Sequence, residues 1–191
     1  MPSEGTGSKR DVGSDGADAA VLPFERRQVF YQPSAPARRA SRNRCDKKMP
    51  ANSSKPILMV DVDGVISLYG FAPGARPAGS FLAVDGIPHF LSAVAGDHLR
   101  DLAPTFDLVW CTGWEERAGE YLPHVLGLSR EIPHLPLAGG AGMASKRAAI
   151  DAFAPPDRPL AWIDDSHTSA CTAWAADRGG PTLLVTTAPP T

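Results

Sequence analysis

Four short, nearly continuous apolar runs constrain the fold of this 191-residue chain more than any other feature. They are PILMVDV (56–62), FDLVWCT (106–112), PLAWIDD (159–165) and PTLLVTT (181–187). Runs of this length are typical of strands that are buried on both faces, as in a parallel sheet. A weaker run, PHLPL (133–137), contains two prolines, which suit only an edge strand. The sequence therefore predicts five strands.

Helical patterns separate these runs. They are SAVAGDHLRDLAP (92–104), WEERAGEYLPHVLGL (114–128), SKRAAIDAF (145–153) and SHTSACTAWAADRGG (166–180). Ser92 is suited to cap the first helix, and Pro123 is expected to kink or end the second one early. Strands that alternate with helices imply right-handed crossovers. We therefore expect an α/β fold with a Rossmann-like, parallel five-stranded sheet flanked by helices.

The segment 65–92 interrupts the alternation of strands and helices. It contains two short apolar stretches, SFLAV and PHFL, on either side of Asp85-Gly86. Asp-Gly is a favoured two-residue turn of a β-hairpin. The sequence therefore predicts a small β flap inserted directly after the first strand.

The N-terminal region differs from the rest of the chain in charge. Up to Lys55 there are eleven Lys and Arg and six Asp and Glu, a net charge of +5, whereas the remainder carries −7. This region is rich in Gly, Ser, Ala and Pro and has no sustained periodicity. We expect residues 1–54 to be a disordered basic tail and residues 55–191 to form one domain. The tail is interpreted as a solvated linker or a segment attracted to the acidic domain, with nucleic-acid phosphate as the alternative partner.

The apolar runs and the cysteines bear on the cellular compartment. No run approaches the length of a membrane span, and the first twenty residues lack the apolar stretch of a signal peptide. The three cysteines are too few and too scattered for a disulfide framework or a zinc site. We therefore expect a cytoplasmic protein without a membrane partner.

Polar side chains gather where the predicted strands end. Asp61 lies at the end of the first run, with Asp63 just beyond it, and Thr112 ends the second run. Asp164 and Asp165 end a later run, and Lys146 lies near the start of the helix that precedes that run. In an open parallel sheet, ligands bind outside the carboxyl ends of the strands, so these side chains are expected to converge there. The residues are Asp61, Asp63, Thr112, Lys146, Asp164 and Asp165.

This set suits phosphoryl transfer through an aspartyl-phosphate. One carboxylate attacks phosphorus, and a second carboxyl group protonates the leaving oxygen and then activates water. A hydroxyl and a lysine hold the phosphoryl oxygens, and Mg²⁺ takes oxygen ligands and screens the crowded carboxylates. Taken singly, each residue has a simpler interpretation: Thr112 as an ordinary strand end, Lys146 as a surface lysine, and Asp164-Asp165 as a helix cap. The order and spacing of these residues, rather than any one of them, favour phosphoryl transfer.

These residues resemble the motifs of the haloacid dehalogenase-like (HAD) superfamily of phosphohydrolases over about residues 56–187. DVDGV (61–65) is similar to the first motif, which makes Asp61 the nucleophile and Asp63 the general acid/base, with the backbone carbonyl of Asp63 as a metal ligand. WCTG (110–113) is similar to the second motif, which implies that Thr112 and Gly113 bind phosphate.

The remaining two motifs of the family have counterparts in the later part of the chain. Lys146 in ASKRAAI matches the third motif, and WIDDS (162–166) resembles the acidic fourth motif. The resemblance implies that Asp164 binds Mg²⁺ directly, and that Asp165 binds it through a water molecule or contacts the residues that bind it. VWCTGWEE and PLAWIDD resemble, more narrowly, a set of bacterial HAD-domain proteins with little assigned function.

The predicted insertions are too short for a separate cap domain, so the site is expected to be open. An open site admits a bulky phosphate such as a nucleotide, a nucleic-acid end or a phosphoprotein, and it gains less from a closing lid. The favoured function is a Mg²⁺-dependent phosphomonoesterase. The alternatives are a catalytically idle HAD-fold domain that binds a phosphorylated ligand or partner, and a phospho-acceptor domain of the receiver type that is phosphorylated at Asp164 or Asp165.

Overall fold

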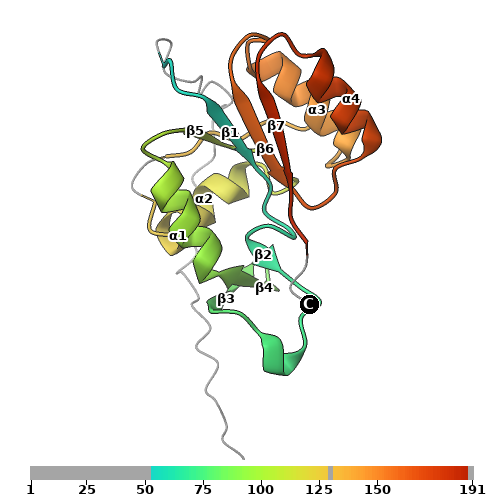
Figure 1. The fold of residues 1–191 in the computed structure, drawn as a ribbon. Helices are drawn as coiled ribbons and strands as arrows, with labels where there is room; N and C mark the ends of the chain where they lie inside the picture. Colours follow the sequence, from blue (N-terminus) through green and yellow to red (C-terminus); the bar gives the residue numbers. More distant parts are fainter. Residues whose placement is uncertain (1–52, 129–130, 189–191) are drawn as a thin grey trace, which may run out of the picture.

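The computed structural model describes residues 53–128 and 131–188, and the four strong apolar runs form one parallel sheet within them (Figure 1). The strands follow the order β5-β1-β6-β7, and every neighbouring pair is parallel. Their bounds are β1 (Ile57–Val60), β5 (Asp107–Trp110), β6 (Leu160–Asp164) and β7 (Thr182–Thr186). The predicted Rossmann-like α/β class is confirmed.

The count of five strands is not confirmed. Residues 133–137 form only one isolated parallel bridge, between Trp110 and His134. Two hydrogen bonds accompany it: the Trp110 amide donates to Pro133 O at 2.8 Å, and the Leu135 amide donates to Trp110 O at 2.9 Å. The prolines at 133 and 136 have no amide hydrogen, which explains why the pairing does not extend into a strand.

The four predicted helices are present at the expected places. They are α1 (Ala93–Leu102), α2 (Glu116–Val125), α3 (Met143–Phe153) and α4 (Ser169–Asp177). The Ser92 hydroxyl caps α1 by accepting a hydrogen bond from the Ala95 amide at 3.2 Å. Pro123 lies in the last turn of α2, which ends two residues later. No helix in the part of the chain that the structure describes combines the length and the apolar character that a membrane span requires.

The sheet is a central layer between two pairs of helices (Figure 1). Side chains of β1 alternate between the two faces, as in any strand. Leu58 packs in the same buried cluster as residues of α1 and α2, whereas Met59 packs with residues of α3 and α4. This double coverage explains why β1 reads as a continuous apolar run.

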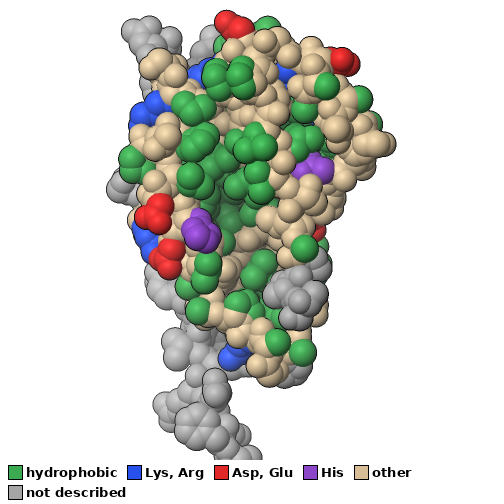
Figure 2. Space-filling model, in the orientation of Figure 1, with side chains coloured by type: hydrophobic (Ala, Val, Ile, Leu, Met, Phe, Trp, Pro, Cys, Tyr) green, Lys and Arg blue, Asp and Glu red, His purple; other side chains and the backbone are tan. Residues whose placement is uncertain are grey.

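The covering helices leave part of one sheet face exposed at β7. Leu183 and Val185 lie on this face, with exposed fractions of 60% and 37%. In Figure 2 hydrophobic side chains gather in the middle of the molecule, where Figure 1 places the sheet.

The predicted flap follows β1 directly and is confirmed. It is a three-stranded antiparallel sheet in the order β2-β4-β3, formed by β2 (Ser67–Leu68), β3 (Gly79–Val84) and β4 (Ile87–Ser92), with a short 3-10 helix, η1 (Pro73–Ala75). Asp85 and Gly86 form its hairpin turn with φ values of 51° and 83°. Arg117 of α2 forms an ion pair with Asp85 at 2.8 Å, which ties the tip of the flap to the main domain.

The predicted basic tail, residues 1–54, lies outside the described residues except for Ser53 and Ser54. Its predicted disorder, its possible nucleic-acid contact and the domain boundary at residue 55 stay predictions.

Candidate active site

The neighbouring strands β1 and β6 mark the point at which the strand order reverses. After β1 the chain moves through the flap and α1 to β5 on one side, whereas β6 lies on the other side of β1. Asp61 directly follows β1, and Asp164 is the last residue of β6. In doubly wound α/β folds a ligand crevice opens at this position. The structure thus places both aspartates where the sequence analysis predicted a site.

Lys146 joins the two aspartates in a buried ion-pair network. Its ammonium nitrogen lies 2.8 Å from Asp61 Oδ2 and 2.7 Å from Asp164 Oδ2. The exposed fractions are 6% for Asp61, 3% for Lys146 and 0% for Asp164. Lys146 reaches this position from the first turns of α3. The interpretation of Lys146 as a surface lysine is therefore wrong.

Burial and neighbouring charges shift the pKa values of this network. Burial raises the pKa of Asp61 from 3.8 to about 6; the Lys146 ammonium opposes this shift and the Asp164 carboxylate adds to it. Burial by itself lowers the pKa of Lys146, but the charges and hydrogen bonds of Asp61 and Asp164 outweigh burial and hold the pKa above its ordinary value. A single ammonium thus faces two carboxylates, which leaves excess negative charge at the strand ends once both aspartates ionise.

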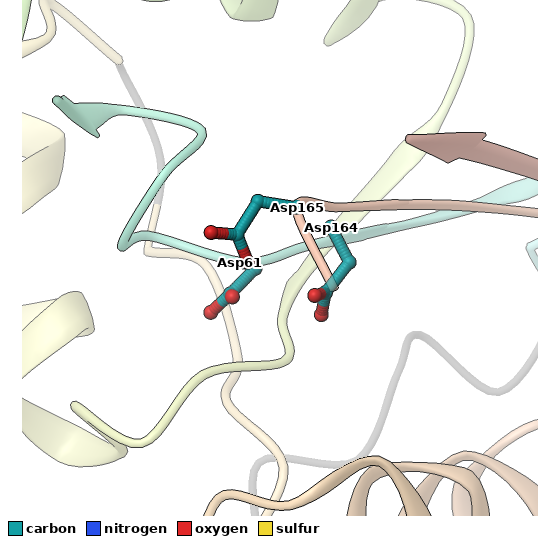
Figure 3. A group of neighbouring side chains, drawn as sticks. All are labelled: Asp61, Asp164 and Asp165. Atoms are coloured by element: carbon teal, nitrogen blue, oxygen red, sulfur yellow. The ribbon is translucent and has the colours of Figure 1, made fainter. Parts of the chain in front are cut away.

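A third carboxylate completes a cluster that suits a cation. Asp61, Asp164 and Asp165 each offer one carboxylate oxygen, and these oxygens lie within 4.8 Å of one another (Figure 3). Oxygen-only donors of this kind fit a hard divalent cation such as Mg²⁺ or Ca²⁺. The excess negative charge at the strand ends fits a cation too. The donor set is therefore compatible with the predicted metal, although carboxylates alone do not select Mg²⁺.

Asp165 is held by the flap and packs over the loop after β1. The Tyr69 hydroxyl donates to Asp165 Oδ2 at 2.8 Å, and the Ser166 hydroxyl donates to Oδ1 at 2.7 Å. A Cβ at Gly64 would overlap the Asp165 carboxylate, and Gly64 also has a positive φ of 76°. Thr187, just after β7, donates to Gly64 O at 3.0 Å. Glycine at position 64 is therefore required by both its backbone conformation and the close approach of Asp165.

The predicted phosphate-binding pair lies at the end of β5, next to β1 in the sheet. Thr112 is buried, and its hydroxyl accepts a hydrogen bond from the Trp114 amide at 3.3 Å. Gly113 is exposed, and a Cβ there would lie 2.8 Å from Ala141 Cβ. The preceding residue, Cys111, is fully buried, and burial raises the pKa of its thiol, so it is a core residue rather than a nucleophile.

Asp63 lies apart from the ion-pair network. Its side chain is half exposed, and its Oδ2 accepts a hydrogen bond from the Trp114 indole nitrogen at 3.0 Å. Nothing in the described residues places Asp63 in the three-carboxylate cluster. Its backbone carbonyl stays a predicted metal ligand.

Two residues at this site, Tyr69 and His89, were missed by the sequence analysis. Both lie in the flap, where no motif or spacing relates them to the strand ends. The sequence contains no signal for their contacts, because these depend on how the inserted hairpin folds back over the sheet.

No model of a known protein family matches this chain, and a search of curated proteins finds no match either. The resemblance to the HAD superfamily therefore stays a prediction from the sequence motifs.

Proposed function

We propose that this chain is a Mg²⁺-dependent phosphomonoester hydrolase of the HAD type, with an HAD-like domain over residues 55–191, and that it acts through an aspartyl-phosphate on Asp61. The observation that carries the proposal is the position of Asp61: it is buried at the end of β1, with its Oδ2 2.8 Å from an ammonium that also holds Asp164. A buried carboxylate beside a fixed cation is positioned for attack and shielded from competing water.

In the first step an oxygen of Asp61 attacks phosphorus, and the bond between phosphorus and the leaving oxygen breaks. The Val62 amide donates to Asp61 Oδ1 at 2.8 Å, so the orientation of the carboxylate is fixed by Val62 and Lys146. Asp63, in its acid form, gives its proton to the leaving oxygen. The products of this step are an alcohol and the aspartyl-phosphate.

In the second step a water molecule attacks phosphorus and gives a proton to the Asp63 carboxylate. The bond between phosphorus and the Asp61 oxygen breaks, and inorganic phosphate leaves. Asp61 is again a carboxylate and Asp63 again an acid, so the cycle closes without any further reactant.

Residues around Asp61 would neutralise the charge of the phosphoryl group. Lys146 uses two of its three N–H donors on carboxylates, which leaves the third for a phosphoryl oxygen. Thr112 and Gly113 at the end of β5 are the other proposed phosphate contacts. The carboxylates of Asp61, Asp164 and Asp165 with the carbonyl of Asp63 would hold Mg²⁺. A bound Mg²⁺ supplies Lewis-acid stabilisation of the transferring phosphoryl group.

The small flap favours a bulky phosphate ester. In the described residues the insertion after β1 consists only of β2, η1, β3 and β4, and Asp63 keeps half of its side chain exposed. The proposed substrates are accordingly nucleotides, nucleic-acid ends or other bulky phosphates, rather than small metabolites that a large cap would enclose.

The test is phosphate release from a panel of phosphomonoesters, including nucleotides and RNA with 3′- or 5′-phosphates, with and without Mg²⁺. We expect Mg²⁺-dependent release that Asp61→Asn abolishes. Asp97→Asn is the matched control, because Asp97 is an exposed carboxylate on α1 and its loss is expected to leave turnover unchanged. Binding of a phosphate ester without any turnover would contradict the proposal and favour an idle domain that binds phosphorylated ligands.

A further inference from the structure

The side chain of Asp63 is held by a neighbour that the mechanism above does not use. Asp63 Oδ2 accepts a hydrogen bond from the Trp114 indole nitrogen at 3.0 Å. Without such a partner a half-exposed aspartate rotates freely about its side-chain bonds. The contact joins the loop after β1 to the loop after β5, across 51 residues of sequence.

Trp114 is itself rigidly held. Its exposed fraction is 8%, and it belongs to the buried cluster under α1 and α2. Its amide donates to the Thr112 hydroxyl at 3.3 Å. The next residue, Glu115, has a positive φ of 47°, and its carboxylate accepts a hydrogen bond from the Leu137 amide at 2.9 Å. A constrained loop therefore presents the indole N–H to Asp63.

The flap supports the same contact from the other side. The His89 ring of β4 packs edge-on against Trp114, with ring centroids 4.5 Å apart. His89 Nδ1 lies 3.0 Å from the Ser67 hydroxyl and 3.8 Å from Asp63 Oδ1. Trp114 thus lies between the core of the domain and the flap, and its position is determined by both.

We propose that Trp114 is a positioning residue for Asp63, and that its indole N–H orients the carboxyl group toward the leaving oxygen of the substrate. This inference rests on the proposed function, because it assigns a supporting partner to the acid of that reaction. The indole nitrogen is a donor only, so Asp63 Oδ2 remains an acceptor throughout the cycle. The transferred proton is consequently carried on Oδ1.

The role of Trp114 predicts a dependence on the leaving group. Protonation of the leaving oxygen matters greatly for an alkyl phosphate, whose alkoxide is a poor leaving group, and little for p-nitrophenyl phosphate. General acid catalysis is worth about 10²–10⁴-fold in rate. Trp114→Phe keeps an aromatic ring and removes the donor, so in the first step the loss is expected to fall on the alkyl ester alone.

The experiment measures kcat and KM of the full chain with Mg²⁺ on p-nitrophenyl phosphate and on glycerol phosphate. We expect Trp114→Phe to lower kcat/KM on glycerol phosphate by about 10²-fold and to leave kcat/KM on p-nitrophenyl phosphate nearly unchanged. The ratio kcat/KM is compared because it reports the first step, whereas kcat also contains the second step, in which Asp63 activates water for both esters. In the Asp63→Asn background the same substitution is expected to add nothing. Trp110→Phe is the matched control, because the Trp110 indole nitrogen is buried without a hydrogen-bond partner among the described residues.

A direct observation of the contact covers the case in which Trp114→Phe does not fold. The chain has four tryptophans, and each gives one indole N–H signal in a ¹H–¹⁵N spectrum. We expect Asp63→Ala to shift the Trp114 signal more than the other three.

Equal losses of kcat/KM on both esters, no loss of kcat/KM on either, or an unshifted Trp114 signal would overturn the positioning role while leaving the proposed function intact. A wild-type protein that hydrolyses neither these esters nor any member of the phosphomonoester panel would overturn the proposed function and this assignment together.

Discussion

The two groups of side chains on either side of the loop after β1 differ in burial and in the contacts that hold them. The sheet-edge group, Asp61, Lys146 and Asp164, is buried and holds itself together by ion pairs at 2.8 and 2.7 Å. In the flap-side group, Asp63, Trp114 and His89, the carboxylate is half exposed, and it accepts one hydrogen bond from Trp114, against which the His89 ring packs. The first group holds two carboxylates and an ammonium in the low-dielectric interior, whereas the second leaves a carboxyl group within reach of solvent and substrate.

This difference matches the two roles proposed for Asp61 and Asp63. A nucleophile benefits from a fixed, dry position, and a group that gives and takes protons needs access to the leaving oxygen and to water. Buried ion pairs are costly to assemble and costly to break, whereas exposed contacts contribute little to stability. Substitutions in the two groups are therefore expected to affect folding very differently.

The largest effect is expected for Lys146→Met in the sheet-edge group. Removing the ammonium leaves two buried carboxylates without a counter-charge, which costs about 3–5 kcal/mol in unfolding free energy. Urea denaturation at neutral pH without divalent cations measures this loss. Arg117→Met is the control: it breaks the Arg117–Asp85 ion pair, whose side chains are more than half exposed, and is expected to cost about 0–1 kcal/mol. Similar losses in the two variants would show that the buried ion pairs stabilise the fold no more than an exposed one does.

A slightly smaller effect is expected for Asp61→Asn, and it depends on pH. The pKa of Asp61 is about 6 in the folded protein and 3.8 without burial, so the folded state binds the proton more tightly. The contribution of Asp61 to wild-type stability therefore falls as pH rises through this window, by ~3 kcal/mol in the absence of metal.

Asparagine does not titrate, so the stability of Asp61→Asn relative to wild type is expected to rise by the same amount between about pH 4 and 7. Urea titrations at several pH values without divalent cations measure it. A difference that is constant with pH would show that burial does not raise the pKa of Asp61.

The smallest effect is expected for Tyr69→Phe, which removes only the flap's hydrogen bond to Asp165. Partners that orient a metal ligand contribute about 10–100-fold to metal affinity, and this exposed contact is expected to lie at the lower end. The Mg²⁺ concentration that gives half-maximal thermal stabilisation measures the change. Tyr121→Phe is the control, because Tyr121 lies on α2, outside the carboxylate cluster. An unchanged Mg²⁺ requirement would show that the flap does not support the cluster.

The same contrast separates what the sequence could predict from what it could not. Asp61, Thr112 and Asp164 follow from strand ends, because the apolar runs place them in register at one edge of the sheet. The contacts of Tyr69 and His89 depend on how a hairpin folds back over that edge, and no local pattern encodes it. The prediction of a fifth strand is not confirmed, and the reason is local: the prolines at 133 and 136 have no amide hydrogen to donate to a neighbouring strand.

The proposed function depends on covalent phosphorylation of Asp61, which mass spectrometry can detect in Asp63→Asn protein incubated with Mg²⁺ and p-nitrophenyl phosphate. Asp63→Asn removes the base that activates water, so an aspartyl-phosphate is expected to accumulate and to release phosphate with hydroxylamine. We expect the phosphate on Asp61. Phosphate on Asp164 or Asp165, or steady turnover without any phosphorylated aspartate, would contradict it.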